Sequence, residues 1–274
     1  MVARKKGSEA EKQSEADRAE EKSTPATPVI YEIVRRVGEE EMSRPSMSLW
    51  WSGVAAGLSM GFSVIAVGVL RMHLPDTEWR PLLLGLGFPV GFLMVVLARQ
   101  QLFTENTITV VLPIMAEPSA RNFGRAGRMW AIVLAANLTG TLCMALVFAF
   151  TPLVGEELRA AMLDVSREGM NHEWLDMACL AILPGFLMAA LVWLIAGSGG
   201  SQFAIVTFIT YLIGTAGFSH IVSGSIEAFL LTVTGELPVG EFFGRFFAPV
   251  LVGNIIGGTA LFALLSHGQV MNEI

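Results

Sequence analysis

One histidine of this sequence lies where an ionisable side chain is unusual. His73, His172 and His267 fall in or beside loops or at the end of an apolar segment, whereas His220 lies inside a long apolar stretch. If that stretch crosses a membrane, an ionisable group costs at least a few kcal/mol there, and a functional role is the default interpretation. Imidazole exchanges protons near neutral pH, so it suits proton transfer to a weak acid. The alternative is a core histidine that hydrogen-bonds a carbonyl group.

Three charged side chains also interrupt apolar stretches. They are Arg99, Glu105 and Glu227. Ions inside a membrane usually pair, so we expect Arg99 to pair with one of the two glutamates and to lock a broken helix. The alternative is that these groups line a pore, where two carboxylates would repel anions and favour neutral or protonated species.

The composition argues against a water-soluble enzyme. Of the 274 residues, 53% are hydrophobic and 15% are charged, against about 25% charged in an ordinary soluble domain. Nine of the 18 basic and ten of the 24 acidic side chains lie in residues 1–45. The sequence has no zinc-type Cys/His spacing, basic face or hydrolase motif. We therefore expect no enzyme activity, no catalytic residue, no metal, no cofactor and no nucleic-acid partner.

The chain divides into a tail, a short surface helix and a membrane body. Residues 1–27 are rich in Glu, Lys, Ser and Ala and are predicted to be a disordered cytoplasmic tail. In residues 28–44, apolar side chains recur at helical spacing against Glu and Arg, which predicts an amphipathic juxtamembrane helix. Residues 45–267 are predicted to be the transmembrane domain, and 268–274 a short cytoplasmic C-terminus.

Six membrane spans are predicted, because a span needs about 20 apolar residues. Uninterrupted candidates lie at 48–71, 129–153, 174–197 and 242–266. Two further stretches, 81–116 and 202–234, are apolar except at their centres. Each is too long for one helix and too short for two, so we expect the second and fifth spans to be broken at the middle of the membrane.

Arginines in the short loops predict the orientation. Residues 1–45 hold nine basic residues, and the 117–128 loop holds three arginines. The 154–173 loop is mostly acidic, and the 235–241 loop has no basic residue. By the positive-inside rule, both termini are expected on the cytoplasmic side. The expected location is the bacterial inner membrane, with the lipid bilayer as one partner.

The two halves of the body resemble one another, at about 45–153 and 173–267. An Asn-x-x-Gly motif at Asn137 returns 117 residues later at Asn254, and the break at Thr104 precedes the one at His220 by 116. Three spans per half is an odd number, so the second half must be inverted. Inverted repeats with broken helices place the substrate site where the breaks meet. The helix N-termini there are expected to offer unpaired N–H donors and positive dipole ends to an anion.

Around these breaks the sequence resembles the formate/nitrite transporter family. Residues 102–107 (Leu-Phe-Thr-Glu-Asn-Thr) are similar to its Leu-Phe-Thr loop, and 217–220 (Gly-Phe-Ser-His) to its Gly-Phe-x-His loop. Residues 253–258 resemble its last-span pattern, and the likeness runs from about 45 to 266. The resemblance implies an all-α, aquaporin-like fold. It also implies a homopentamer with one pore per protomer and passage of small monovalent anions or their conjugate acids.

The resemblance also implies roles for individual residues. Thr104 matches the loop threonine that hydrogen-bonds the pore histidine, and His220 matches that histidine. The matches for the apolar constrictions are Phe88, Phe92 and Ile213 on the extracytoplasmic side and Leu102 on the inner side. Two positions depart from the family pattern. Where the family often has a lysine before its fourth span, this sequence has Gly169 nearby, and where the family has a pore asparagine, this sequence has Gly185.

These features predict a channel or transporter for small weak-acid anions such as formate or nitrite. Apolar constrictions block a naked ion, because its desolvation is too costly. A weak acid that takes a proton at His220 would cross as a neutral molecule. Two alternatives stay open: a channel for small neutral solutes, and a non-conducting membrane scaffold or sensor that works through its charged tail.

Overall fold

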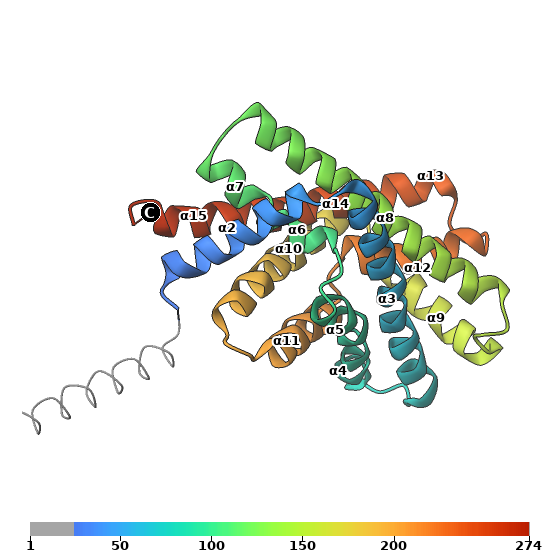
Figure 1. The fold of residues 1–274 in the computed structure, drawn as a ribbon. Coiled ribbons are helices and arrows are strands. Elements are labelled where there is room, and N and C mark those ends of the chain that lie inside the picture. The colour runs from blue at the N-terminus through green and yellow to red at the C-terminus, as the bar shows by residue number, and fades with distance from the viewer. Residues whose placement is uncertain (1–24, 274) are drawn as a thin grey trace, which may run out of the picture.

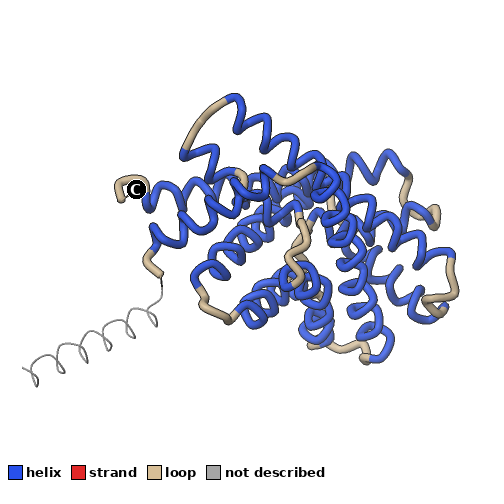
Figure 2. Tube along the Cα trace, viewed as in Figure 1, coloured by secondary structure: helices blue, strands red, loops and turns tan. Residues whose placement is uncertain are grey.

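A computed structural model describes residues 25–273 (Figure 1). All regular secondary structure in this range is helical, as Figure 2 shows. The tail predicted at 1–27 lies almost wholly outside the described residues. Within it, residues 25–26 are loop, and Thr27 begins helix α2 (Thr27–Ser43), which corresponds to the predicted juxtamembrane helix.

Five helices are long and apolar enough to cross a membrane. They are α3 (Ser46–His73), the run Arg80–Leu97, α8 (Ala120–Phe150), α10 (Trp174–Gly197) and the run Val239–Val270. The run Arg80–Leu97 comprises α4 (Arg80–Leu84), η1 (Gly85–Gly87) and α5 (Pro89–Leu97). The run Val239–Val270 comprises α13 (Val239–Glu241), the π-helical η2 (Phe242–Phe247), α14 (Ala248–Ile255), the π-helical η3 (Ile256–Ala263) and α15 (Leu264–Val270).

The predicted fifth span is made of two shorter apolar helices. These are α11 (Gln202–Thr215) and α12 (Ile221–Val233). The second predicted span likewise continues, after its break, into α6 (Phe103–Thr109) and α7 (Val111–Ala116). Five long helices and one broken pair are consistent with six spans, although the count itself stays a prediction.

Both breaks have the same local geometry. Arg99 (φ 53°) and Gly217 (φ 67°) are in the left-handed region, which ends the preceding helix. Leu102 and His220 then precede the next helices with extended backbones, at φ −112° and −111°. Leu102 is therefore the structural counterpart of His220, and the predicted pairing of Thr104 with His220 as equivalent positions was two residues out.

An asparagine from a neighbouring helix holds each break. Asn254 Oδ1 accepts from the Ile221 N–H at 2.9 Å, and its Nδ2 donates to the Ala181 and Ser219 carbonyls at 2.7 and 3.2 Å. Asn137 plays the same role at the first break: its Oδ1 accepts from the Phe103 N–H at 2.9 Å, and its Nδ2 donates to the Gln101 carbonyl in the break and to the Gly53 carbonyl of α3. Backbone that leaves a helix inside a membrane needs such partners, because lipid offers none.

The glycine of the same motif brings two helices close together. A Cβ atom on Gly140 of α8 would lie 2.4 Å from the Val54 carbonyl oxygen of α3. One on Gly257 would lie 1.9 Å from the Ile182 carbonyl oxygen of α10. The repeated Asn-x-x-Gly motif therefore has two structural roles: the asparagine satisfies a broken helix, and the glycine admits a close neighbour.

Two predicted boundaries are corrected. The acidic 154–173 segment is not a loop, because α9 (Glu156–Gly169) occupies most of it. The last helix runs to Val270, so the predicted C-terminal tail from 268 onward begins three residues too early. In both cases polar side chains were read as loop, whereas helix ends that extend beyond a membrane tolerate them.

The surface helix and the end of the chain lie side by side in Figure 1. The Tyr31 hydroxyl of α2 lies 2.8 Å from His267 Nδ1 of α15. The Tyr31 side chain is fully buried. The described ends of the chain therefore lie on the same face of the molecule.

Candidate functional site

His220 is held by both of its ring nitrogens. It is the residue before α12, and its Nδ1 accepts a hydrogen bond from the Ser223 N–H at 3.2 Å. Its Nε2 lies 2.9 Å from Thr104 Oγ1 of α6. Because a backbone N–H can only donate, Nδ1 carries no proton, and the neutral ring donates from Nε2 to Thr104. Both side chains are buried.

The N–H groups at the start of α12 are largely satisfied within the chain. The Ile221 N–H bonds to Asn254, the Ser223 N–H to the His220 ring and the Gly224 N–H to the His220 carbonyl oxygen at 2.8 Å. The expectation of free N–H donors is therefore wrong for these three groups. The positive end of the helix dipole remains, but the groups that would contact a ligand directly are side chains.

Apolar side chains stand next to the histidine. The Phe92 ring packs edge-on to the His220 ring at 5.1 Å, and Phe88 lies 5.1 Å from Phe92. Phe92 and Ile213 are fully buried, whereas Phe88 is half-buried. Leu102, fully buried, ends the first break. The structure therefore gathers the predicted aromatic residues around His220, while the roles of all four as constrictions stay predictions.

A cavity of about 440 Å³ leads to His220 from one end of the molecule. Its inner wall is formed by Phe88, Ser219, His220 and Ser223. Its outer wall comes from the end of α3, the segment before α4 and the end of α9, and includes Arg71, Asp76, Arg80, Glu168 and His172. Glu227 lies in the wall of the same cavity.

The expected pairing of Arg99 with a glutamate is not formed. Arg99 is exposed at the turn and takes no part in the ion pairs found among residues 25–273. Glu227 lies in the cavity wall, on the outer side of His220. Glu105 lies on α6 in the interior of the chain, where its Oε1 is buried without a hydrogen-bond partner in the described structure. The left-handed backbone at Arg99 turns the chain at this point, and sequence spacing did not reveal it.

The opposite side of the breaks is covered by α2. Its Glu41 accepts hydrogen bonds from Gln101 Nε2 at 2.8 Å and from Thr109 Oγ1 at 2.9 Å. Gln101 is the residue before Leu102, so the surface helix is attached directly to the first break. Burial raises the pKa of Glu41, while the Gln101 and Thr109 hydrogen bonds and Arg44 oppose this shift.

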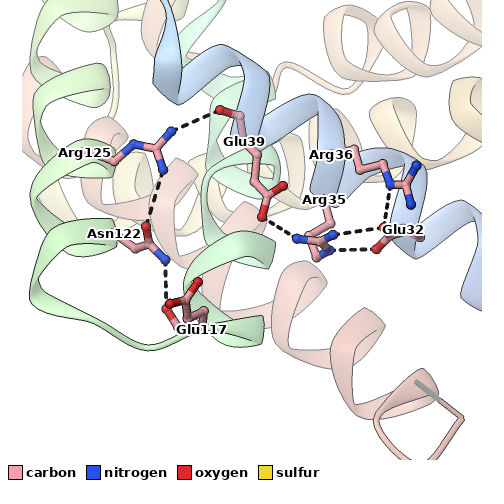
Figure 3. Close-up of polar contacts among 7 residues, drawn as sticks. All are labelled: Glu32, Arg35, Arg36, Glu39, Glu117, Asn122 and Arg125. Atoms are coloured by element: carbon pink, nitrogen blue, oxygen red, sulfur yellow. Dashed lines mark hydrogen bonds and ion pairs between the residues drawn. The ribbon is translucent and has the colours of Figure 1, made fainter.

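Figure 3 shows how the outer face of α2 is fixed. Arg35 pairs with Glu32 at 2.7 Å and also with Glu39. Arg125 of α8 donates to the Glu39 carbonyl oxygen at 3.2 Å. The arginines hold the pKa of Glu32 low, at about 2. These ion pairs on the surface are each worth about 0–1 kcal/mol, so the partly buried hydrogen bonds of Glu41 matter more for docking.

We expect docking of α2 to tighten as the pH falls. A carboxyl whose pKa is raised by burial binds its proton more tightly in the docked state, so docking weakens as the pH rises through that pKa. Hydrogen exchange of the α2 amides, corrected for the intrinsic rate, measures this. Glu41→Gln is expected to remove the pH dependence, and Glu40→Gln, on the exposed face, to keep it. Equal pH responses in Glu41→Gln and wild type would contradict the prediction.

Sequence reasoning missed two features of the site. The asparagines were recognised as a repeat but not as the groups that hold the breaks. Glu41 was read only as part of a polar helix face, and nothing in the pattern marked it as a contact of the first break. Within residues 25–273, no three His, Cys, Asp or Glu side chains lie close enough to hold a metal ion.

The sequence is similar to those of known membrane proteins. The model of the formate/nitrite transporter family matches residues 28–268. The chain is 41% identical over 245 residues to the inner membrane protein YfdC of Escherichia coli, which covers 89% of this chain and 79% of that protein. It is 24% identical over 241 residues to the formate channel FocA of Haemophilus influenzae, covering 78% of this chain and 84% of FocA.

The fold is similar to those of solved channels. A pentameric formate channel with formate bound matches with a TM-score of 0.71 at 19% identity, over 83% of this chain and 98% of that one. An FNT family ion channel matches with a TM-score of 0.71 at 20% identity, over 90% and 98%. At these identities the likeness concerns the fold alone, and it confirms the predicted all-α integral-membrane fold class.

Proposed function

This chain belongs to the formate/nitrite transporter family, and we propose that it is an inner-membrane channel, not an enzyme, for small monovalent weak-acid anions such as formate or nitrite. One observation carries the proposal. A cavity of about 440 Å³ ends at His220, whose ring contacts Thr104 where the two helix breaks meet. Broken helices that meet inside a membrane form the substrate sites of many transporters.

The assembly and orientation are part of the same proposal. We propose a homopentamer, because a solved structure of this fold is a pentameric channel. Both ends of the described chain lie on one face, and α2 covers the breaks from that face (Figure 1). The positive-inside rule assigns this face to the cytoplasm, so the cavity opens to the extracytoplasmic side.

Passage in neutral form follows from the surroundings of His220. Phe88, Phe92 and Leu102 offer no partner for a charge, and moving a bare carboxylate past them is very costly. The protonated acid avoids that cost. The dipole of α12 and the Thr104 hydroxyl would draw the anion inward, and the apolar side chains would pass the acid.

His220 is better suited to binding the acid than to supplying its proton. Its Nδ1 is occupied by the Ser223 N–H, so the ring holds one proton, at Nε2, and directs it to Thr104. The Thr104 oxygen thereby accepts from His220, and the threonine hydrogen is free to donate to a substrate oxygen. We therefore modify the expectation of protonation at His220: the proton comes with the substrate, and the pair binds the protonated acid.

Flux into proteoliposomes that contain a pH-sensitive dye tests the proposal. Formate, nitrite, lactate, hydrosulfide, chloride and glycerol are compared in stopped-flow uptake, with protein-free liposomes as the control. We expect weak-acid uptake that increases as the external pH falls, and exclusion of chloride, which takes no proton in this range. Glycerol flux without anion flux would assign the chain to neutral solutes. If the folded protein transports none of these solutes, a role as a scaffold or sensor would be favoured.

A further inference from the structure

One face of α12 carries the polar wall of the cavity from its outer part to the histidine. His220, Ser223, Gly224 and Glu227 all line the cavity. They are spaced at i, i+3, i+4 and i+7, which places them on one side of a helix. At 1.5 Å per residue, Glu227 lies about 10 Å further out along α12 than His220. A solute that enters from outside therefore passes Glu227 first.

The positive charges of this cavity already have partners. Arg71 pairs with Glu168 at 2.6 Å, and Arg80 with Asp76 at 3.1 Å. Arg80 also donates to the Arg71 carbonyl oxygen at 3.1 Å. Glu227 has no ion pair or hydrogen bond among the described residues, and its carboxylate is the charge of the wall that is left over. The remaining titratable side chains facing the cavity are His172, at the mouth, and His220.

The end of α9 leaves space beside this carboxylate. A Cβ atom on Gly169 would lie 3.0 Å from Glu227 Oε2. Any side chain at 169 would therefore start within contact of Glu227. With glycine there, the carboxylate faces the open cavity, with nothing from α9 to neutralise it.

Such a carboxylate is a barrier to an anion and a binding site for an acid. Two carboxylates cannot both stay ionised when they share a poorly solvated site, and they bind one proton between them. On the basis of the proposed weak-acid transport, we infer that Glu227 is a proton-coupling residue. It admits a weak-acid anion to the cavity only together with one proton, as a carboxylate–carboxylic acid pair.

The proton balance of this step is simple. One proton from the extracytoplasmic water binds to Glu227, and its O–H group hydrogen-bonds to the incoming anion. As the substrate moves inward, the O–H bond to Glu227 breaks and an O–H bond forms on the substrate oxygen. The neutral acid then moves to the His220–Thr104 pair, and the Glu227 carboxylate is free for the next proton. His220 needs no second proton in this sequence.

The experiment measures formate uptake into proteoliposomes at external pH 5.5 and 7.5. The wild type is expected to take up far more formate at the lower pH. Glu227→Gln cannot bind or transfer the proton, so formate uptake should fall by about tenfold or more at pH 7.5, where almost no formic acid is in solution. The fall should be smaller at pH 5.5, so the ratio of uptake at the two pH values should rise. Glu227→Asp keeps a carboxyl and should retain the wild-type ratio.

The matched control is Glu168→Gln, which removes the same charge from the outer wall of the same cavity. It is expected to keep the wild-type pH ratio, because its proton is not transferred. An unchanged ratio in Glu227→Gln, or equal changes in both variants, would overturn the inference. Absence of weak-acid flux in the wild type would instead overturn the proposed function.

A second variant keeps the test valid if Glu227→Gln does not fold. Gly169→Lys places an ammonium group within reach of Glu227, in a chain that retains the carboxylate. Paired with the ammonium group, Glu227 stays ionised and cannot carry the proton, so formate uptake at pH 7.5 should fall and the pH ratio should rise as in Glu227→Gln. A wild-type ratio in folded Gly169→Lys would count against Glu227 as the coupling group.

Discussion

Weak-acid uptake through His220→Asn is expected to fall by about ten- to a hundredfold, because a buried hydrogen-bonding group of the substrate site is lost. Asparagine still caps α12, since its side-chain oxygen can accept from the Ser223 N–H as the His220 ring does. It cannot reproduce the 2.9 Å contact with Thr104. A loss of flux in a folded His220→Asn protein therefore reports on the pore and not on the helix end.

The partner residue gives an independent reading of the same site. Thr104→Val keeps the shape and removes the hydroxyl, and we expect a similar loss, whereas Thr104→Ser should keep most of the flux. The double variant should lose little more than either single one, because both remove the same pair. His73→Ala, at the exposed end of α3, is the control. Wild-type uptake in His220→Asn would refute the proposed role of the pair.

The second large effect is expected for stability. Asn254→Ala deprives the Ile221 N–H and the Ala181 and Ser219 carbonyls of their partner at once. Each buried group left unpaired costs about 1–3 kcal/mol, so the unfolding free energy should fall by about 3 kcal/mol or more. Denaturant or thermal unfolding of the detergent-solubilised protein measures the change.

The internal symmetry supplies a check on this prediction. Asn137→Ala removes the equivalent three bonds at the first break and should destabilise the protein by a similar amount. Asn171→Ala, at an exposed position after α9, is the neutral comparison. If Asn254→Ala has the same unfolding midpoint as Asn171→Ala, Asn254 does not hold the break.

Local patterns predicted the elements of the chain well where one property dominated. Long apolar runs predicted α3, α8 and α10, since only a helix satisfies its own backbone in lipid. Both breaks were predicted because polar residues interrupt runs of unsuitable length. The predictions failed where a polar pattern fits two structures, such as a loop or a helix, or an exposed side chain or one that contacts the body. The acidic segment around Glu156–Gly169 forms α9, and Glu41 on a polar helix face is a partly buried attachment to Gln101.

The sequence by itself determined the membrane body, its two breaks, the isolation of His220 and the family. These depend on composition, periodicity and short motifs, which are local properties of the chain. Only the tertiary structure decided which groups meet: His220 with Thr104, Asn254 with the second break, Arg71 with Glu168, and Glu227 with none among the described residues. Contacts between residues far apart in the chain depend on how helices pack. Packing alone therefore separates an unpaired carboxylate in a cavity from one that neutralises an arginine.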